Sequence, residues 1–257
     1  MNIFKSIPLG LKLFRCIGKY TPLLREIENI RETGDVEKER RYIAEKTGIW
    51  VDEVIDIFNL TVNVKGHENV PMDEPCVFIC NHESYGDIFV LFRALAGKQI
   101  GFVAKEDLKK VPYFGKWITA IRGVYIERGD ARAALRSIQK GVSFLKQGFS
   151  LVIFPEGTRS HGPVMGEFKA GSFKLATKAR VPVVPISLNG TYHVFEEHNV
   201  ITGGATVDIV IHPPIDTASL SRHEVAELPQ HVETIIKNSF NDLVRIEEER
   251  LKGGKLK

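Results

Sequence analysis

Residues 75–87 have the sequence Pro75-Cys76-Val77-Phe78-Ile79-Cys80-Asn81-His82-Glu83-Ser84-Tyr85-Gly86-Asp87, and the stretch changes character halfway along. Its apolar run, residues 76–80, ends in polar Asn81 and His82, and an apolar-periodic segment follows from Ile88. This order predicts a strand, a turn and a helix. Because open α/β sheets bind ligands at the carboxyl ends of their strands, His82 is the first candidate for a catalytic base.

The spacing of His82 and Asp87 limits how the two side chains can meet. Five residues turn through about 500° on a continuous helix, so the pair can meet only if His82 lies in the turn. A carboxylate there would hold one imidazole nitrogen and leave the other to accept a proton. The alternative is structural, because Ser84-x-x-Asp87 resembles a capping box, which satisfies amides at a helix start without catalysis.

Length and composition are those of an ordinary globular protein. The 257 residues suit one α/β domain with an appendage, or two small domains, and 43% of them are hydrophobic. Cys16, Cys76 and Cys80 form no disulfide framework and no paired metal-binding pattern. We interpret the two cysteines of the apolar run as inert core residues of a reducing compartment.

The small net charge of +3 is unevenly distributed. Residues 1–20 contain no acid and four bases, Lys5, Lys12, Arg15 and Lys19. A basic end on a nearly neutral body indicates a localised anionic partner and argues against a nucleic-acid surface spread over the fold. The sequence has no uninterrupted apolar run long enough for a spanning helix and no clear signal-peptide cleavage site, so we expect this segment to be retained.

The same segment has a basic amphipathic pattern. At helical spacing one arc is apolar and the four bases lie opposite; the arc consists of Ile3, Phe4, Ile7, Leu11, Phe14 and Ile17, widened by Leu9 and Leu13. Pro8 and Pro22 each favour the first turn of a helix, so we expect several short helices. The arc would dock on an anionic membrane, and the alternative is that it packs on the body of the protein as core.

The rest of the chain alternates between strand and helix patterns. Helices are predicted over 23–32, 36–46, 49–60, 85–96, 114–121, 131–147, 172–178 and 224–251, and a break at Gly34-Asp35. Strands are predicted over 61–65, 76–80, 100–104, 123–127, 151–154, 181–188 and 205–211. Such alternation predicts the α/β class, with a largely parallel sheet covered by helices on both faces.

Polar residues follow several of the predicted strands. Lys105 and Arg128 each follow one strand, and Glu156-Gly157-Thr158-Arg159 follows another. All of them would gather with His82 at one edge of the sheet. Any one of these bases alone is best interpreted as a solvated charge on a loop. Three cations beside one histidine instead suit the binding of a phosphate.

Four blocks of the sequence resemble the glycerolipid acyltransferases, and among them the PlsC-like 1-acylglycerol-3-phosphate acyltransferases. The first, Asn81 to Asp87, is similar to that family's N-H-x-S-x-x-D, and the order of the others matches as well. They are Lys105 to Arg128 with Pro112, Gly115 and Gly123 inside, Phe154-Pro155-Glu156-Gly157-Thr158-Arg159-Ser160, and Val181-Pro182-Val183-Val184-Pro185-Ile186. A lone H-x-x-x-x-D is weak, whereas four ordered blocks over residues 81–186 are specific.

The resemblance implies an enzyme of phospholipid biosynthesis that transfers a fatty acyl group from acyl-CoA or acyl carrier protein to the 2-hydroxyl of lysophosphatidic acid. His82 would be the base and Asp87 its orienting carboxylate. Lys105, Arg128 and Arg159 would hold the phosphate, Glu156 would position a glycerol hydroxyl or a cation, and backbone amides near Gly157 would stabilise the oxyanion. Gly157 and Thr158 belong to the same acceptor-binding set. No cofactor and no metal is expected, because His82 and Asp87 fall short of a zinc site.

The expected architecture is a membrane-docking helical region over residues 1–60 and an α/β acyltransferase domain over residues 61–257, peripheral or monotopic on the cytoplasmic face of the cell membrane. The third block favours lysophosphatidate over glycerol 3-phosphate as acceptor, although glycerol 3-phosphate or another lysophospholipid is an alternative. A thioesterase or lipid hydrolase is a further alternative that would not need the cations, and a noncatalytic lipid-binding protein would not need His82 and Asp87. For Val181 to Ile186, packing explains the sequence at least as well as a substrate site.

Overall fold

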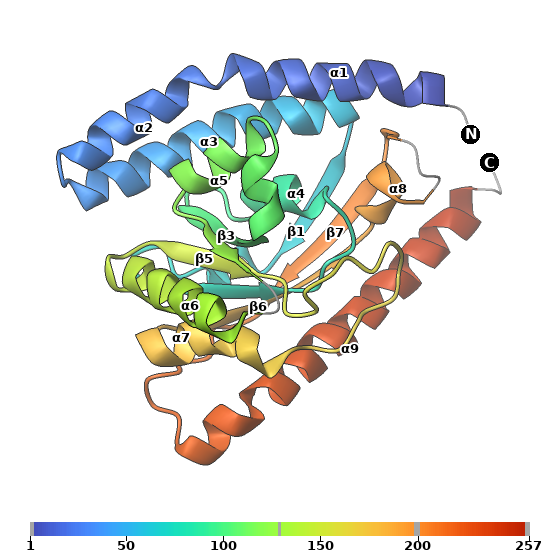
Figure 1. The fold of residues 1–257 in the computed structure, drawn as a ribbon. Coiled ribbons are helices and arrows are strands. Elements are labelled where there is room, and N and C mark those ends of the chain that lie inside the picture. The colour runs from blue at the N-terminus through green and yellow to red at the C-terminus, as the bar shows by residue number, and fades with distance from the viewer. Residues whose placement is uncertain (1–2, 128–129, 198–200, 255–257) are drawn as a thin grey trace.

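A computed structural model describes residues 3–127, 130–197 and 201–254 of the chain. Its helices and strands alternate along most of the sequence (Figure 1). The helices are α1 (Ile3–Lys19), α2 (Pro22–Glu32), α3 (Val36–Phe58), α4 (Asp87–Ala94), α5 (Phe114–Ala120), α6 (Ala131–Lys146), α7 (Lys174–Ala179), α8 (Tyr192–Phe195) and α9 (Arg222–Gly254). The strands are β1 (Thr61–Lys65), β2 (Val77–Cys80), β3 (Ile100–Lys105), β4 (Val124–Ile126), β5 (Ser150–Ile153), β6 (Val183–Asn189) and β7 (Thr206–Ile211).

The strands form one sheet in the order β1-β7-β6-β2-β5-β3-β4. Within the described residues every neighbouring pair is parallel except β6 and β7, so the predicted largely parallel α/β sheet is confirmed. β2 lies centrally, between β5 and β6, with Ile79 beside Ile153 on one side and Pro185 on the other. The carboxyl ends of β2, β3, β4, β5 and β6 therefore share one edge.

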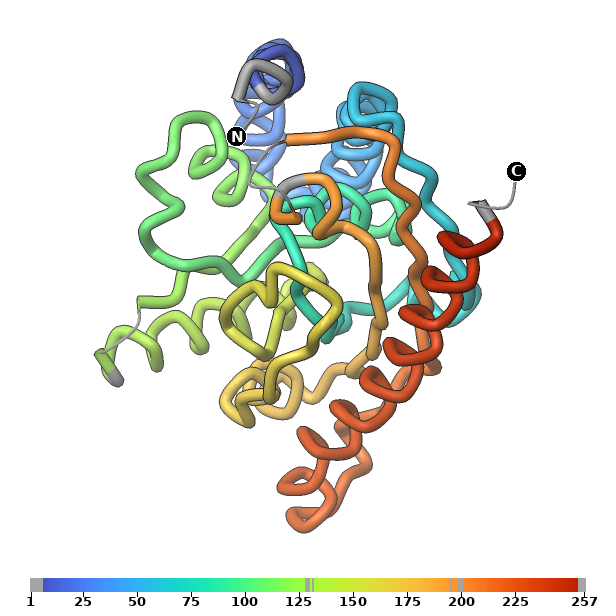
Figure 2. The backbone as a smooth tube through the Cα atoms, turned by 90° about the vertical axis from the view of Figure 1, so that its right-hand side faces the viewer, coloured from blue at the N-terminus to red at the C-terminus, as the bar shows by residue number. Residues whose placement is uncertain are grey.

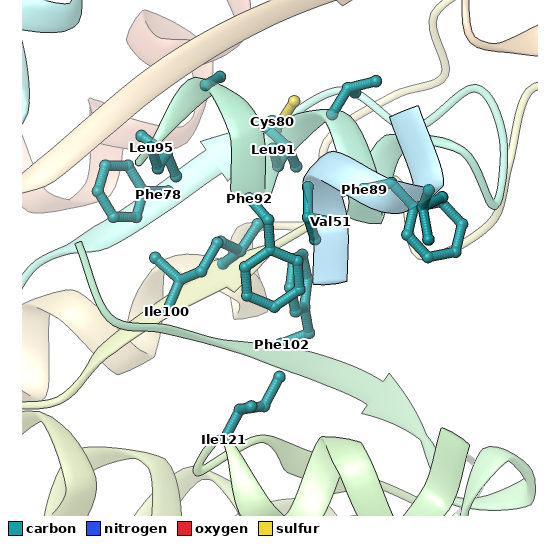
Figure 3. Close-up of a cluster of buried hydrophobic side chains, with 14 of the residues drawn as sticks. Val51, Phe78, Cys80, Phe89, Leu91, Phe92, Leu95, Ile100, Phe102 and Ile121 are labelled. Carbon is teal, nitrogen blue, oxygen red and sulfur yellow. The ribbon is translucent and has the colours of Figure 1, made fainter. Parts of the chain in front are cut away.

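Side chains of alternate residues along β2 enter two separate cores. Phe78 and Cys80 lie in the core under α1–α5, part of which is shown in Figure 3, whereas Val77 and Ile79 pack against α6, α7 and α9. All four are fully buried. A strand buried on both faces is continuously apolar, which is why residues 76–80 show no polar alternation.

The N-terminal helices pack on the first of these faces. In Figure 2, α1 and α3 lie side by side at the top, and α9 runs from the bottom up the right-hand edge of the molecule. Cys16 and Ile17 of α1 are buried in the core with Val51 and Val54 of α3. The helices α1, α2 and α3 thus share a core with the sheet.

The apolar arc of α1 is divided between core and solvent. Ile17 is buried, whereas Ile7, Leu11 and Phe14 are 54%, 54% and 51% exposed. Leu9 and Leu13 also pack against the core, so the packing alternative holds for the side of α1 that carries Leu9, Leu13 and Ile17. No helix among the described residues is long and apolar enough to cross a bilayer.

Two sequence expectations about the helices are wrong. The predicted helices 36–46 and 49–60 are one helix, α3, because burial of Trp50 and Val51 outweighs the helix penalty of Gly48, about 1 kcal/mol. Pro8 does not begin a helix but lies inside α1, which starts at Ile3. Pro22, in contrast, is the first residue of α2, as predicted.

The two prolines of the fourth block occupy places that suit them. Pro182 precedes β6, and Pro185 lies within it, between the Ile186–Ile211 pair and the isolated Val183–Ile215 bridge. The ladder with β7 is interrupted there, so the missing N–H of Pro185 costs no ladder bond. This placement agrees with the packing interpretation of Pro185.

Candidate active site

His82 lies in the loop between β2 and α4, at the carboxyl edge of the sheet. Asn81 fixes this loop, because its side chain donates to the Leu188 carbonyl at 2.8 Å and accepts from the Leu188 amide at 2.9 Å. The imidazole stacks on Phe154 with 3.9 Å between ring centroids and 14° between planes. Its side chain is 16% exposed, so it remains reachable from solvent.

His82 and Asp87 meet as the turn geometry requires. His82 Nδ1 lies 2.6 Å from Oδ2 of Asp87, the first residue of α4, and the Asp87 side chain is fully buried. This contact leaves Nε2 as the ring nitrogen available to accept a proton. The pair therefore has the geometry of a general base with its orienting carboxylate.

Asp87 also performs the structural task that its capping-box pattern predicts. Its Oδ2 accepts from the amides of Glu83 at 2.8 Å and Ser84 at 3.2 Å, while Ser84 Oγ accepts from the Gly86 amide. The Ser84 side chain thus accepts from the amide of Gly86, the residue before α4. Asp87 accepts in return from the Ser84 amide, as in a capping box. The structural and catalytic interpretations of Asp87 are compatible.

A second buried carboxyl, Glu83, lies beside Asp87. Its Oε2 accepts from the amides of Gly190 at 2.9 Å and Thr191 at 3.1 Å, and Oε1 is buried with no partner among the described residues. Burial, and then the charge of Asp87, raise the pKa of Glu83 well above its ordinary value. Thr191 joins the two acids, because its hydroxyl donates to Asp87 Oδ1 and lies 3.2 Å from Glu83 Oε2.

Glu156 joins the His82 loop to the segment that contains Gly166. Its Oε1 accepts from the His82 amide at 2.7 Å and its Oε2 from the Gly166 amide at 2.7 Å. A Cβ at Gly166 would lie 2.9 Å from Oε2, so a larger residue would push the carboxyl out of this position. Burial raises the pKa of Glu156 to about 7, against the lowering effect of both amides. Both of its oxygens face backbone amides, where the sequence analysis expected a glycerol hydroxyl or a cation.

The loop after β5 wraps around the His82 loop. The amides of Ser160 and His161 donate to the carbonyls of His82 and Glu83, at 2.8 Å and 3.2 Å. Gly157 has a φ of 71° and donates to the Phe154 carbonyl at 3.1 Å, so its amide is already engaged in a turn. Thr158 is exposed on the same loop.

Arg159 is the cation of the third block, and it is held from two sides. Its Nη1 lies 2.6 Å from Oε1 of Glu196, and its guanidinium stacks over the Tyr85 ring at 3.7 Å from the centroid. The Glu196 side chain is almost fully buried, and its Oε2 has no partner within the described part of the chain. Tyr85 belongs to the His82 loop, so the stack brings Arg159 to that loop.

The other two predicted cations are less defined. Lys105 is exposed at the end of β3, one strand beyond β5, and so lies on the expected edge. Arg128 lies outside the described residues. Among the residues that are described, no group of His, Cys, Asp or Glu side chains is arranged to hold a metal ion.

Sequence reasoning missed Glu83, Thr191 and Glu196 as members of the site. Thr191 carried a usable signal, because it follows β6 and the end of that strand shares an edge with the end of β2. Glu83 lay inside the first block, beside His82. Nothing in the local pattern marks Glu196, which reaches Arg159 only through the path of the chain after β6.

Comparison with known proteins gives a consistent picture. The family model described as Acyltransferase matches residues 61–189, about half of the chain. A 1-acyl-sn-glycerol-3-phosphate acyltransferase of Pseudomonas aeruginosa is 30% identical over 201 residues, which cover 78% of this chain and 76% of that protein. The crystal structure of the 1-acyl-sn-glycerophosphate acyltransferase PlsC from Thermotoga maritima superimposes with a TM-score of 0.77 at 30% identity, covering 95% of this chain and 98% of that one.

A chloroplastic 1-acyl-sn-glycerol-3-phosphate acyltransferase of Brassica napus is 36% identical over 170 residues. This alignment covers 65% of the present chain and 48% of the plant protein. The chain thus spans about half the length of that relative, whereas it matches nearly the whole of the Thermotoga maritima structure.

Proposed function

Because the chain belongs to the acyltransferase family, we propose that it transfers a fatty acyl group from an acyl thioester to the 2-hydroxyl of lysophosphatidic acid, forming phosphatidic acid. The observation that carries this proposal is the 2.6 Å contact between His82 Nδ1 and Asp87 Oδ2 at the carboxyl edge of the sheet. The donor is acyl-CoA or acyl carrier protein. The names of the relatives support lysophosphatidate as the acceptor.

In the proposed reaction His82 Nε2 removes the proton of the acceptor hydroxyl while that oxygen attacks the thioester carbonyl carbon. Asp87 holds the ring and stabilises the imidazolium that forms. When the tetrahedral intermediate collapses, the carbon–sulfur bond breaks and the thiolate takes the proton from His82. The ester and the free thiol leave, and no covalent bond to the enzyme is needed.

The acceptor phosphate would be bound by Arg159, with Lys105 and Arg128 completing a cationic rim. Stacking on Tyr85 holds the guanidinium plane in one orientation, which suits bidentate binding of a phosphate. Glu156 would act through the His82 loop, because both of its oxygens accept from backbone amides. Gly157 and Thr158 would shape the loop that passes over the acceptor.

Residues 1–60 would dock the enzyme on an anionic membrane, on its cytoplasmic face, and residues 61–257 would form the acyltransferase domain. The support for docking is the exposure of Ile7, Leu11 and Phe14 on α1. Residues 1–20, which include this helix, contain four bases and no acid. Burial of such side chains in lipid is worth roughly 1.5–3 kcal/mol each. Because Cys16 and Ile17 belong to the core, point substitutions test docking more cleanly than a deletion does.

The test of the reaction is mass spectrometry of the products formed when the full chain is mixed with lysophosphatidate and either acyl-CoA or acyl carrier protein thioester. We expect phosphatidate with one of the donors. Free fatty acid as the main product would favour a thioesterase or hydrolase. A similar rate with glycerol 3-phosphate would reassign the acceptor.

A further inference from the structure

A cationic groove lies between α2 and α5, apart from the His82 loop. Its volume is about 540 Å³, and its walls come from α2, α5 and the 3₁₀ helix Glu106–Lys110. The residues that line it are Thr21, Leu24, Arg25, Glu28, Lys109, Gly115, Lys116 and Thr119. We define this set as the α2–α5 groove.

The α2–α5 groove has three bases and one acid, and the bases come from all three of its walls. Arg25, Lys109 and Lys116 are exposed, and so is Glu28. Lys109 is 3.5 Å from Glu106, and no other ion pair of the groove bases is found within the described residues. The groove therefore presents a net positive charge that its own acid does not cancel.

Gly115 keeps the walls close together. A Cβ at this position would lie 2.3 Å from the Lys109 carbonyl oxygen, so α5 could not approach the 3₁₀ helix with any other residue. The Gly115 carbonyl also accepts from Thr119 at 3.0 Å and from Tyr125 at 2.7 Å. The backbone around Lys109 and Lys116 is thus fixed, although their side chains are long.

An exposed apolar strip adjoins the groove. Phe14 of α1 packs edge-on against Tyr113, with 5.0 Å between ring centroids, and Tyr113 lies two residues before Gly115 in the chain. The strip consists of Ile7, Leu11, Phe14 and Val111, all of which are exposed. Cations beside exposed apolar side chains match the two parts of a phospholipid, its phosphate and its acyl chains.

We propose that the α2–α5 groove binds the phosphate headgroup of an anionic bilayer phospholipid while the exposed strip of α1 and Val111 enters the acyl region. This inference rests on the membrane docking proposed above and gives it a defined lipid site. None of its lining residues belongs to the His82 loop or to the cations proposed for the acceptor, although Lys105 precedes the 3₁₀ helix that forms one wall. A lipid phosphate held between α2 and α5 would orient α1 on the membrane and with it the edge of the sheet that carries His82.

The experiment measures binding of the full chain to vesicles of phosphatidylcholine alone, with added phosphatidic acid, and with added phosphatidylglycerol. The groove variant is Arg25→Gln/Lys109→Gln/Lys116→Gln. The matched control, Lys140→Gln/Lys174→Gln/Lys237→Gln, removes the same charge from α6, α7 and α9, on the other face of the sheet. A base near an anionic bilayer is worth about a fivefold gain in affinity, so the groove variant should lose on the order of 100-fold on anionic vesicles and the control far less.

Two further measurements localise the effect. Glu28→Gln removes the acid of the groove and should strengthen binding to anionic vesicles about fivefold, by the same estimate. A fluorophore attached to Cys in the Thr119→Cys variant should respond to a short-chain phosphatidic acid and not to inorganic phosphate. A response to inorganic phosphate alone would identify a free-anion site instead of a lipid site and would overturn the proposal.

Equal losses in the groove variant and the control would mean that only net charge matters, which would also overturn the proposal. Unchanged vesicle binding together with lost use of acyl carrier protein would assign the groove to that acidic protein. These measurements do not depend on acyl transfer. If the proposed reaction failed and vesicle binding behaved as expected, the lipid site would stand.

Discussion

Thr191 donates its hydroxyl hydrogen to Oδ1 of Asp87, the carboxylate oxygen opposite the one that contacts His82. Thr191 follows β6, whereas Asp87 begins α4, so this bond joins the ends of two neighbouring strands. Both residues are buried. With the amides of Glu83 and Ser84 on Oδ2, the bond fixes the carboxylate from both oxygens.

We expect Thr191→Val to lower kcat about tenfold, because a hydrogen bond to a charged group contributes about 1.5–3 kcal/mol and its loss allows the carboxylate to turn away from His82 Nδ1. Thr191→Ser keeps the hydroxyl and should restore kcat. A lower melting temperature with unchanged kcat would assign Thr191 a purely structural role.

His82→Ala should reduce acyl transfer by about 10²- to 10⁴-fold, the usual contribution of a positioned general base. The fold should persist, because the imidazole is partly exposed and lies at the edge of the core. Asp87→Asn should lower the rate strongly, because a neutral amide does not stabilise the imidazolium. When the Asn oxygen replaces Oδ2, its nitrogen replaces Oδ1 and cannot accept the bond that Thr191 donates, so stability should fall as well. Near-normal turnover by His82→Ala with a normal melting profile would remove His82 as the base.

Glu156 makes stability depend on pH near neutrality. Its pKa is raised to about 7, so between the unfolded value of 4.5 and pH 7 the folded state binds more protons than the unfolded state does. The unfolding free energy therefore falls as pH rises through this window, by about 3 kcal/mol for this group. Urea unfolding of the protein and of Glu156→Gln measures the effect.

The Glu156→Gln variant cannot titrate, so its stability relative to the original protein should increase from pH 5 to pH 8. At pH 5 the variant should be less stable than the original protein, because the amide nitrogen cannot accept the bond that Gly166 or His82 donates. A stability difference that stays constant across this range would show that Glu156 does not titrate there.

The sequence was sufficient to locate the central strands, because each is a short, largely apolar run. β2, β5 and β6 are buried at every position, so their burial leaves an unambiguous local pattern. The sequence predicted helix boundaries near Gly48 and Pro8 that the structure does not have, because tertiary packing outweighs the low helix propensity of these two residues. The Asp87–His82 contact was predictable from spacing, since only one turn geometry allows it.

The surroundings of that pair were not predictable, because they depend on long-range contacts. Glu83 and Thr191 are 108 residues apart in the chain, and Arg159 and Glu196 are 37 apart. A lone Glu beside His82 has many possible roles until its position relative to β6 is known. The exposed part of the α1 arc likewise depended on which side faces α3, since both sides of the helix carry apolar residues.

Arg159 and Glu196 give a final prediction about the acceptor phosphate. Because Glu196 already holds Nη1 at 2.6 Å, a phosphate would bind the other N–H donors of the guanidinium beside this carboxylate or displace it. Arg159→Ala should raise KM for lysophosphatidate, with a loss of about 1.5–3 kcal/mol, and change use of monoacylglycerol much less. Arg159→Lys should recover only part of this loss, because an ammonium neither stacks on Tyr85 nor binds bidentately.

Glu196→Gln should have the opposite effect on KM from Arg159→Ala. It removes the negative charge that competes for the guanidinium and keeps a side chain of the same size. We expect KM for lysophosphatidate to fall and KM for monoacylglycerol to stay unchanged. Lys178→Ala, an exposed charge removed from α7 on the other face of the sheet, is the control. If Arg159→Ala harms both acceptors equally, the guanidinium serves the loop and not the phosphate. If Glu196→Gln raises KM for lysophosphatidate as well, Glu196 holds Arg159 in its binding position and does not compete with the ligand.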